Sequence, residues 1–231
     1  MPVYETSLYL SIVSGSAAQT TSIISHLLPK LYLSLPEIPE GASTAALVSC
    51  LHFLVAAYPS QGRYAEHRDA LGPKFVARQS SQDRWLNKVT RVMRQRNYAA
   101  LDGLTGQGHL KSLIPDDQDR KLSPRSTTGL AHDALCTLVN ALRMKVRDTT
   151  WLVLRSAYRE LHIPADTSNG TSPWLCRSLA LRPVVSVNGS DTEGEDSGIL
   201  VKAWLTQKSA ANEILLKDGT ADRWLVCKVK A

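Results

Sequence analysis

The chain has 231 residues, 43% of them hydrophobic, so it is long enough to bury a core as one large domain or two small ones. Its 27 basic and 21 acidic residues give a net charge of +6, which favours an anionic partner without requiring one. No apolar run approaches the roughly 18 residues that a membrane span needs, and Met1–Glu5 has no basic segment typical of a secretory signal. We therefore expect an intracellular protein, nuclear and/or cytoplasmic, with no membrane partner.

Two short helices are expected over residues 4–35, where leucine and isoleucine recur at helical spacing with an interruption at Pro29. A third helix, capped by Ser43 or Thr44, is expected to run to about Tyr58. Its side chains are apolar nearly all round, which predicts that this helix is buried.

A cationic amphipathic helix is predicted over residues 83–101, with its large apolar side chains on one face. The cations in and before it are Lys74, Arg78, Arg84, Lys88, Arg91, Arg94 and Arg96. Only Asp83 opposes them. Such a surface attracts a phosphate backbone through counterion release, but it is equally compatible with pairing to acidic residues of the same chain, such as Asp116, Asp117 and Asp119. Because Trp85 and Tyr98 are expected in the core, stacking of single-stranded bases is not indicated.

The segment from Asp102 to Gly129 is rich in Gly, Asp, Ser and Pro, which predicts a long mobile connection. Its stretch Gly103–His109 has the outer glycine spacing of a phosphate-binding loop, but a histidine stands in place of the required lysine. The strongest helical pattern follows over residues 131–161. Because it exceeds the length of a typical globular helix, a break or bend is expected near Arg143–Asp148.

The C-terminal part has the order helix, helix, hairpin, which is typical of a winged helix. A helix is expected from Ser172-Pro173 and another over Ile199–Lys208, separated by an acidic, solvated insertion at 182–198. Two apolar-containing runs around Asp218-Gly219 predict the hairpin. Its predicted core consists of Trp204, Leu215, Leu216, Trp224 and Val226. The candidate contacts to DNA or RNA here are Lys202, Lys208 and Lys217.

Catalytic and metal-binding patterns are absent from the sequence. It has no nucleophile elbow, zinc-protease motif or dinucleotide fingerprint, and its four cysteines lie 40 or more residues apart without ligand spacing. Four reduced thiols in the core are expected. His132 and Asp133 are adjacent in a helix, where their side chains diverge. We therefore expect a non-enzymatic protein with no catalytic residues, no metal, no cofactor and no small-molecule substrate.

Two stretches resemble the Sac/GANP family of the PCI superfamily. Arg94–Leu101, with its Asn97-Tyr98 pair, is similar to one helix of that family, and Val146–Arg159 is similar to its stretch of an arginine before a helix closing in Ala-Tyr-Arg. PCI proteins stack helical hairpins onto a winged helix and serve in the proteasome lid, the signalosome, initiation factor complexes and messenger-RNA export. The resemblance implies a scaffold whose winged helix docks a partner and whose basic surfaces hold nucleic acid.

The expected fold is mainly α-helical. It has a helical-repeat, PCI-like body over residues 1–163 and a winged-helix module with a small β-hairpin over residues 164–231. The expected function is a scaffold or adaptor subunit in nuclear messenger-RNA export or processing, with other protein subunits and RNA or DNA as partners. Two alternatives stay open: a small subunit of a proteasome-lid or signalosome-like complex, and a winged-helix nucleic-acid-binding protein outside these complexes.

Overall fold

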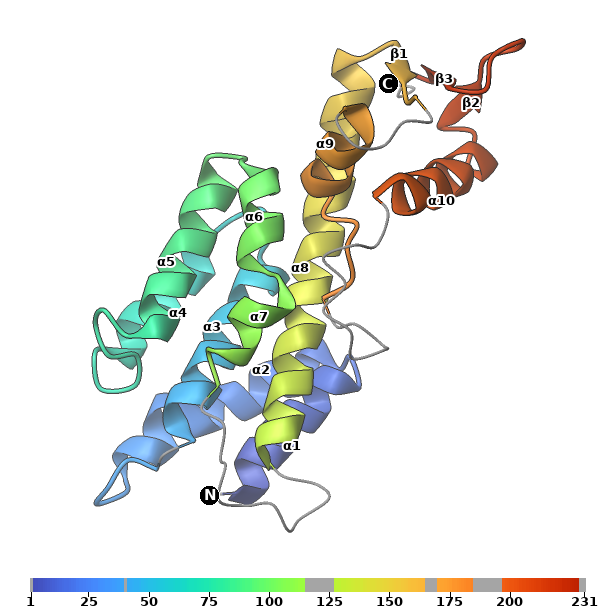
Figure 1. Cartoon of the computed structure of the whole chain (residues 1–231). Coiled ribbons are helices and arrows are strands. Elements are labelled where there is room, and N and C mark those ends of the chain that lie inside the picture. The colour runs from blue at the N-terminus through green and yellow to red at the C-terminus, as the bar shows by residue number, and fades with distance from the viewer. Residues whose placement is uncertain (1, 40, 115–126, 165–169, 185–196, 229–231) are drawn as a thin grey trace. The chain divides into compact units, whose positions relative to one another are not determined.

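The computed structural model describes residues 2–39, 41–114, 127–164, 170–184 and 197–228 of the chain (Figure 1). Over these residues the protein is mainly helical, with ten α-helices and one small antiparallel sheet of three strands. The expected fold class is confirmed at this level. Within the described ranges, no helix has both the length and the apolar character that crossing a bilayer requires.

Close contacts divide the chain into two compact units. The first joins Met1–Arg91 to Thr105–Leu142, and the second joins Val92–Leu104 to Arg143–Ala231. This grouping differs from the expected division at residues 163 and 164. The reason is that two segments of the expected body pack with the C-terminal elements. These segments are Val92–Leu104 and the residues from Arg143 onward.

The first unit begins with α1 (Pro2–Val13) and α2 (Ala17–His26), which pack against each other. A π-helical turn, η1 (Leu27–Leu31), follows, and inside it Leu28 has an extended backbone with φ −123° and ψ 127°. A residue before proline is pushed out of the helical region by the proline ring, so the interruption expected at Pro29 is confirmed.

The buried helix expected next is α3 (Ala42–Ala56), which has no charged residue and forms much of the first unit's core. The expected cap is wrong. The N-cap residue is Gly41, without a side-chain hydrogen bond, and Ser43 and Thr44 already belong to the first turn. α4 (Gly62–Leu71) then packs against α3.

The cationic helix expected over residues 83–101 is two helices, α5 (Ser81–Arg94) and α6 (Tyr98–Leu104). The chain turns because Arg96 adopts a left-handed conformation, with φ 53°. The Asn97 N–H donates to the Val92 carbonyl at 2.9 Å and the Arg96 N–H to the Met93 carbonyl at 3.1 Å, a Schellman closure. The Asn97 side chain then caps α6 by accepting the Ala100 N–H at 3.1 Å.

The first part of the expected mobile connection is folded. It contains the end of α6 and a short helix, α7 (Gln107–Lys111), and Leu110 is completely buried. The glycines of 103–108 therefore lie in and between helices rather than in an open loop. Residues 115–126 lie outside the described residues, so the prediction for the rest of the connection is not tested.

α8 (Thr127–Ala157) runs for 31 residues without the break expected near Arg143–Asp148. The break was expected from the length of the helix alone, but within this stretch Arg143 is almost completely buried, with 2% of its surface exposed. Its partners lie in the second unit, as described below, so Arg143 makes a buried contact of a continuous helix.

The second unit adds α9 (Thr171–Ser178), α10 (Ser197–Ala210) and three strands, β1 (Glu160–His162), β2 (Ile214–Leu216) and β3 (Arg223–Val226). The sheet order is β1-β3-β2, and both pairings are antiparallel. The predicted hairpin is β2 and β3. β1 was not predicted, although its alternating side chains before Pro164 hint at a strand. The N-cap expected at Ser172 is wrong, because α9 begins at Thr171 and its N-cap is Gly170. Residues 185–196 of the acidic insertion lie outside the described residues.

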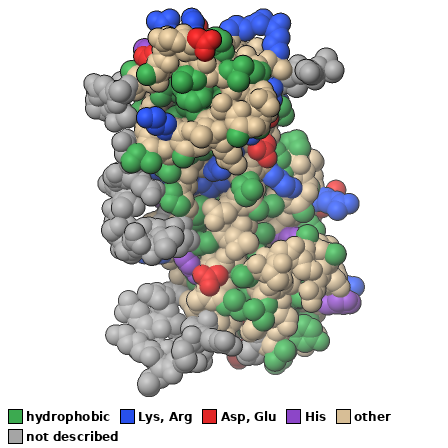
Figure 2. Space-filling view, turned by 90° about the vertical axis from the view of Figure 1, so that its right-hand side faces the viewer, with side chains coloured by type: hydrophobic (Ala, Val, Ile, Leu, Met, Phe, Trp, Pro, Cys, Tyr) green, Lys and Arg blue, Asp and Glu red, His purple; other side chains and the backbone are tan. Residues whose placement is uncertain are grey.

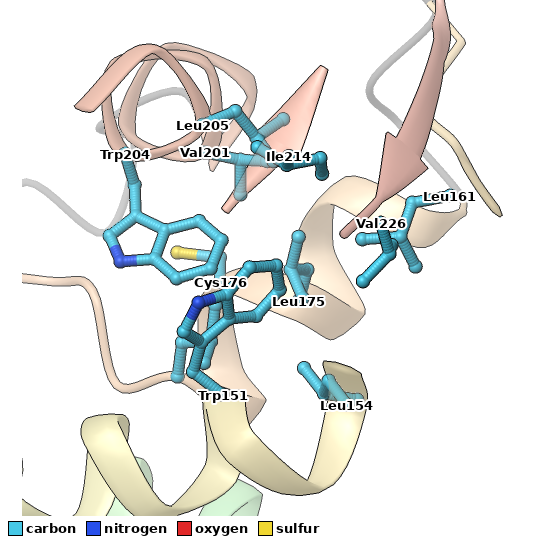
Figure 3. Packing of buried hydrophobic residues seen from close by; sticks show 11 residues of the cluster. Trp151, Leu154, Leu161, Leu175, Cys176, Val201, Trp204, Leu205, Ile214 and Val226 are labelled. Atoms are coloured by element: carbon cyan, nitrogen blue, oxygen red, sulfur yellow. The ribbon is translucent and has the colours of Figure 1, made fainter. Parts of the chain in front are cut away.

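The core of the second unit collects apolar side chains from α8, α9, α10 and the sheet. The rings of Trp151 and Trp204 meet edge to face (Figure 3). Their centroids lie 4.6 Å apart. The other members are Leu154, Leu161, Leu175, Cys176, Leu179, Val201, Leu205, Ile214 and Val226.

Two members of the predicted core are wrong. Leu215 and Leu216 are 47% and 46% exposed, whereas Ile214 between α10 and the sheet is fully buried. Side chains alternate along a strand, so an inward Ile214 turns Leu215 outward. Leu216, the last residue of β2, is exposed as well. Trp224 is half-buried. Apolar side chains accordingly reach the surface over the α10 and β2 side of the second unit, in the upper part of Figure 2.

Candidate functional site

The outer face of α5 carries the most concentrated positive charge among the predicted site residues. Arg84, Lys88 and Arg91 follow one another at steps of four and three residues, so they project from one side of the helix, with Arg94 at its flank. All four side chains are exposed. The apolar side chains of the helix are buried on the opposite side: Trp85, Leu86, Val89 and Met93.

The one acidic residue of α5 does not neutralise this face. Asp83 is buried and forms an ion pair with Arg68 of α4. Its second oxygen accepts the Gln79 N–H at 3.0 Å. Arg68 also donates to the Asn87 side chain at 2.6 Å and to the Tyr64 hydroxyl at 3.1 Å. The Asp83 carboxylate therefore belongs to a fixed α4–α5 contact.

The other predicted cations near α5 are also exposed. Lys74 and Arg78 lie in the turn before α5, and Arg96 lies in the turn after it. Within the described ranges, none of the seven cations forms an ion pair. The carboxylates proposed as their internal partners, Asp116, Asp117 and Asp119, lie outside those ranges. We call Arg84, Lys88, Arg91 and Arg94 the α5 stripe.

The three lysines predicted in the C-terminal module have a different setting. Lys208 pairs with Glu213 at 3.1 Å, and its ammonium lies 5.9 Å from the centre of the Trp204 ring. Lys217 pairs with Glu160 at 3.5 Å. Lys202 is exposed on α10. Two of the three charges are thus matched within the module, so these lysines do not form a cationic face like that of α5.

Glu213 is the centre of a polar contact in the second unit. It accepts the Trp151 indole N–H at 2.7 Å and pairs with Arg155 at 3.3 Å. Burial alone would raise the pKa of Glu213, but hydrogen bonds from Trp151 and Lys208 and the nearby positive charges hold this pKa below its usual value. Arg155 also donates to the Cys227 carbonyl at 3.0 Å, which ties the end of β3 to α8.

Sequence reasoning missed the buried arginines of α8. Arg143 pairs with the buried Asp102 of α6 and donates to the Arg182 carbonyl at 2.8 Å. Arg147, one turn later, donates to the carbonyls of Leu179 and Ala180 at 2.9 and 2.7 Å. These carbonyls end α9, where a cation also interacts favourably with the helix dipole. Burial lowers the pKa of both arginines, an effect that the Asp102 charge partly offsets. Their four-residue spacing was visible, but nothing in it indicated burial.

A serine–histidine contact in the first unit does not form a nucleophile. Ser49 lies 2.8 Å from His67 Nε2, but the Ser49 hydroxyl donates its proton to the Ala46 carbonyl at 2.8 Å. His67 must then donate to Ser49 and cannot withdraw its proton. Burial, together with the neighbouring His52, lowers the pKa of His67 to about 4. The pair has the geometry of a core hydrogen bond.

The buried thiols do not form nucleophiles either. Cys50, Cys136 and Cys176 are buried and free, and Cys227 is half-buried, so the expectation of four core thiols holds for three. Burial raises the pKa of Cys50 to about 12 and that of Cys136 to about 11, so both stay protonated near neutral pH. Among the described residues, no three His, Cys, Asp or Glu side chains gather where they would hold a metal ion.

One exposed aromatic pair was also missed. Tyr158, just after α8, and Trp174 of α9 have ring centres 6.2 Å apart at an interplanar angle of 64°. Trp174 is 37% exposed and Tyr158 44% exposed.

No protein-family model, no curated protein and no solved structure matches this chain.

Proposed function

We propose that this chain is a non-enzymatic scaffold or adaptor subunit of PCI type in nuclear messenger-RNA export or processing. The observation that carries the proposal is the order of elements in the second unit. The end of α8, β1, α9, α10, β2 and β3 follow as helix, strand, helix, helix, strand, strand, with the last strand in the middle of the sheet. This order supports a winged helix, and its place after a stretch of helices supports the PCI part of the proposal.

The scaffold role is also supported by how the polar groups of the second unit are used. Glu213, Arg143 and Arg147 join separate elements through hydrogen bonds and ion pairs inside the unit. Such contacts fix the relative positions of helices and sheet, which suits a module that presents a rigid surface to a partner. In this proposal, the winged helix docks another protein subunit.

Nucleic acid is the second partner in this proposal, held by the α5 stripe. Four exposed cations along about 15 Å of helix axis would face several phosphates, because duplex nucleic acid carries one charge per about 1.7 Å of its axis. The exposed side of α5 offers no large apolar side chain, which most protein interfaces need at their centre. This favours a polyanion over an acidic protein as the ligand of the stripe.

The nucleic-acid part is tested with Arg91→Glu combined with Arg94→Glu. The variant should bind RNA and DNA more weakly, and the slope of log affinity against log salt should fall by about 0.7–0.9 for each phosphate that the variant no longer neutralises. Lys30→Glu combined with Lys111→Glu makes the same change in net charge at exposed sites off the stripe. Equal losses of affinity in both variants, or no salt-dependent binding by the wild-type protein, would rule out the stripe.

The protein-partner part is tested by affinity purification from nuclear and cytoplasmic extracts, with and without nuclease, followed by mass spectrometry. Export or processing factors should co-purify, and they should remain bound after nuclease treatment. Proteasome-lid or signalosome subunits in their place would establish the first alternative. Nucleic acid without any stable protein partner would favour a winged-helix nucleic-acid-binding protein outside these complexes.

A further inference from the structure

The Tyr158–Trp174 pair stands apart from most other large aromatic side chains of the protein. Trp85, Trp151 and Trp204 are 4%, 2% and 6% exposed, whereas Trp174 is 37% exposed. Leaving so much ring surface in water forgoes favourable burial, since a large aromatic side chain can remove roughly 150–250 Å² from solvent. This exposed aromatic pair therefore offers a surface that a bound ligand would cover.

Both rings are held on rigid supports. Trp174 lies in α9 beside Leu175 and Cys176, which are completely buried in the core of the second unit. The C-terminal end of the same helix is fixed by the hydrogen bonds from Arg147. The Tyr158 N–H donates to the Leu154 carbonyl at 2.9 Å, which continues the hydrogen bonding of α8. A ligand would thus meet rings that are already in place, so binding costs little conformational entropy.

Two exposed arginines lie close to the rings along the chain. Arg177 follows Trp174 by three residues, which places it on the same side of α9, and Arg159 directly follows Tyr158. Both side chains are exposed, and within the described residues neither forms an ion pair.

The carboxylates of the sheet region have other partners. Glu160 pairs with Lys217 and Arg223, and Asp222 pairs with His162 at 2.7 Å. Among the described residues, these pairs leave the charges of Arg159 and Arg177 available to an anionic ligand.

We propose that Tyr158, Trp174, Arg159 and Arg177 form a platform for single-stranded nucleic acid. Bases stack on exposed aromatic rings irrespective of sequence, and the two guanidinium groups would hold the adjacent phosphates. A duplex keeps its bases stacked inside and cannot offer them to the rings. A proline-rich peptide also binds aromatic pairs, but it has no anionic groups for the two arginines.

This platform is independent of the proposed PCI role and of the α5 stripe. The stripe has only cations and polar groups on its exposed side, so it would hold single and double strands through phosphates alone. The platform would distinguish the two forms, because stacking requires an unpaired base. Its recognition uses base faces and phosphates rather than the 2′-hydroxyl, so RNA and DNA strands of one sequence should bind alike.

The test uses the full chain and a fluorescently labelled RNA strand of about 12 nucleotides, a length within the range that single-strand-binding folds occupy, alone and as a duplex. Binding is followed by anisotropy. Trp174→Ala should weaken binding of the single strand about tenfold or more, and leave duplex binding unchanged. Trp174→Phe should retain most of the affinity because it keeps an aromatic face. Arg177→Gln should weaken binding and lower its salt dependence.

Leu152→Ala is the matched control, since Leu152 is 51% exposed on α8 but carries no ring. Circular dichroism and thermal unfolding of each variant establish that the fold is kept, and Trp174→Phe reports on the platform even if Trp174→Ala is destabilised. Equal affinity of wild type and Trp174→Ala for the single strand would overturn the proposal. So would parallel losses of affinity for strand and duplex, a Trp174→Phe variant as weak as Trp174→Ala, or binding of a proline-rich peptide without any strand. A stripe variant, Arg91→Glu with Arg94→Glu, should instead weaken strand and duplex together.

Discussion

Cations recur at helical spacing on both α5 and α8, but the two helices use them in opposite ways. On α5, Arg84 and Arg91 are exposed, and the described part of the chain offers them no ion-pair partner. On α8, Arg143 is 2% exposed and pairs with a buried carboxylate, while Arg147 holds the carbonyls at the end of α9. The same residue type is therefore a surface charge on one helix and a structural link on the other.

The difference lies in what surrounds each position. The apolar side chains of α5 occupy one side, so its cations are left on the other. On α8, the groups around Arg143 and Arg147 include a carboxylate and several peptide carbonyls that need donors. A buried guanidinium is stable only when such partners satisfy it. Partner groups distant in the sequence thus decide the role of each arginine.

The largest effect on stability is expected from a substitution in α8. Arg143→Ala should lower the free energy of unfolding by about 3 kcal/mol, the lower end of the cost of breaking a buried ion pair, because the buried Asp102 loses its nearer cation and keeps the more distant Arg182 at 3.9 Å. Arg91→Ala on α5 is the control and should change it by less than about 0.5 kcal/mol. Urea or guanidinium unfolding followed by circular dichroism measures both. Similar costs for the two variants would show that Arg143 is not a structural link.

The ion pair itself can be examined with a double variant. Asp102→Leu combined with Arg143→Met removes both charges, and it should recover part of the stability that Arg143→Ala removes, since an apolar pair of similar volume often replaces a buried ion pair at little cost. Recovery should remain incomplete, because the Arg182 carbonyl is left without its donor as well. A double variant less stable than either single variant would contradict this account.

Periodic patterns predicted the elements whose apolar side chains repeat over several turns. The exposed cations of α5 were predicted because Trp85, Leu86, Val89 and Met93 define the opposite face. β1 was missed, since three alternating residues are too short a pattern. The break expected in α8 from its length was wrong, since the helix is continuous, and the exposure of Trp174 could not be foreseen because it depends on which side of α9 the core covers.

A smaller effect is expected from a buried histidine of the first unit. His67 donates to Ser49 and has a pKa of about 4 in the folded protein, below the ordinary value of 6.5. Its neutral form is favoured by folding, so its contribution to stability is fully present above pH 6.5 and disappears as the pH falls towards 4. We expect the free energy of unfolding to fall by about 1–2 kcal/mol over this range, a value reduced for the partial exposure of the ring.

Unfolding by urea near neutral pH and at a pH just above the pKa of His67 measures this contribution. His67→Gln keeps a donor towards Ser49 but cannot be protonated, so its stability should fall less over this interval than that of the wild-type protein. His109→Gln, which changes an exposed histidine of α7, should behave like the wild type. Identical pH dependence of wild type and His67→Gln would mean that His67 does not contribute through its protonation.

The smallest effect on stability is expected at the α5 stripe. Arg84→Gln combined with Arg91→Gln removes two exposed charges from a helix whose buried face is unchanged, so the free energy of unfolding should shift by less than about 0.5 kcal/mol. The same variant should bind nucleic acid more weakly at low ionic strength. A destabilisation above about 1 kcal/mol would instead indicate that these arginines pair with carboxylates of the same chain, the role considered for Asp116, Asp117 and Asp119. Unchanged stability together with unchanged binding would leave the α5 arginines as solvated surface charges, and the platform at Trp174 as the nucleic-acid contact still to be tested.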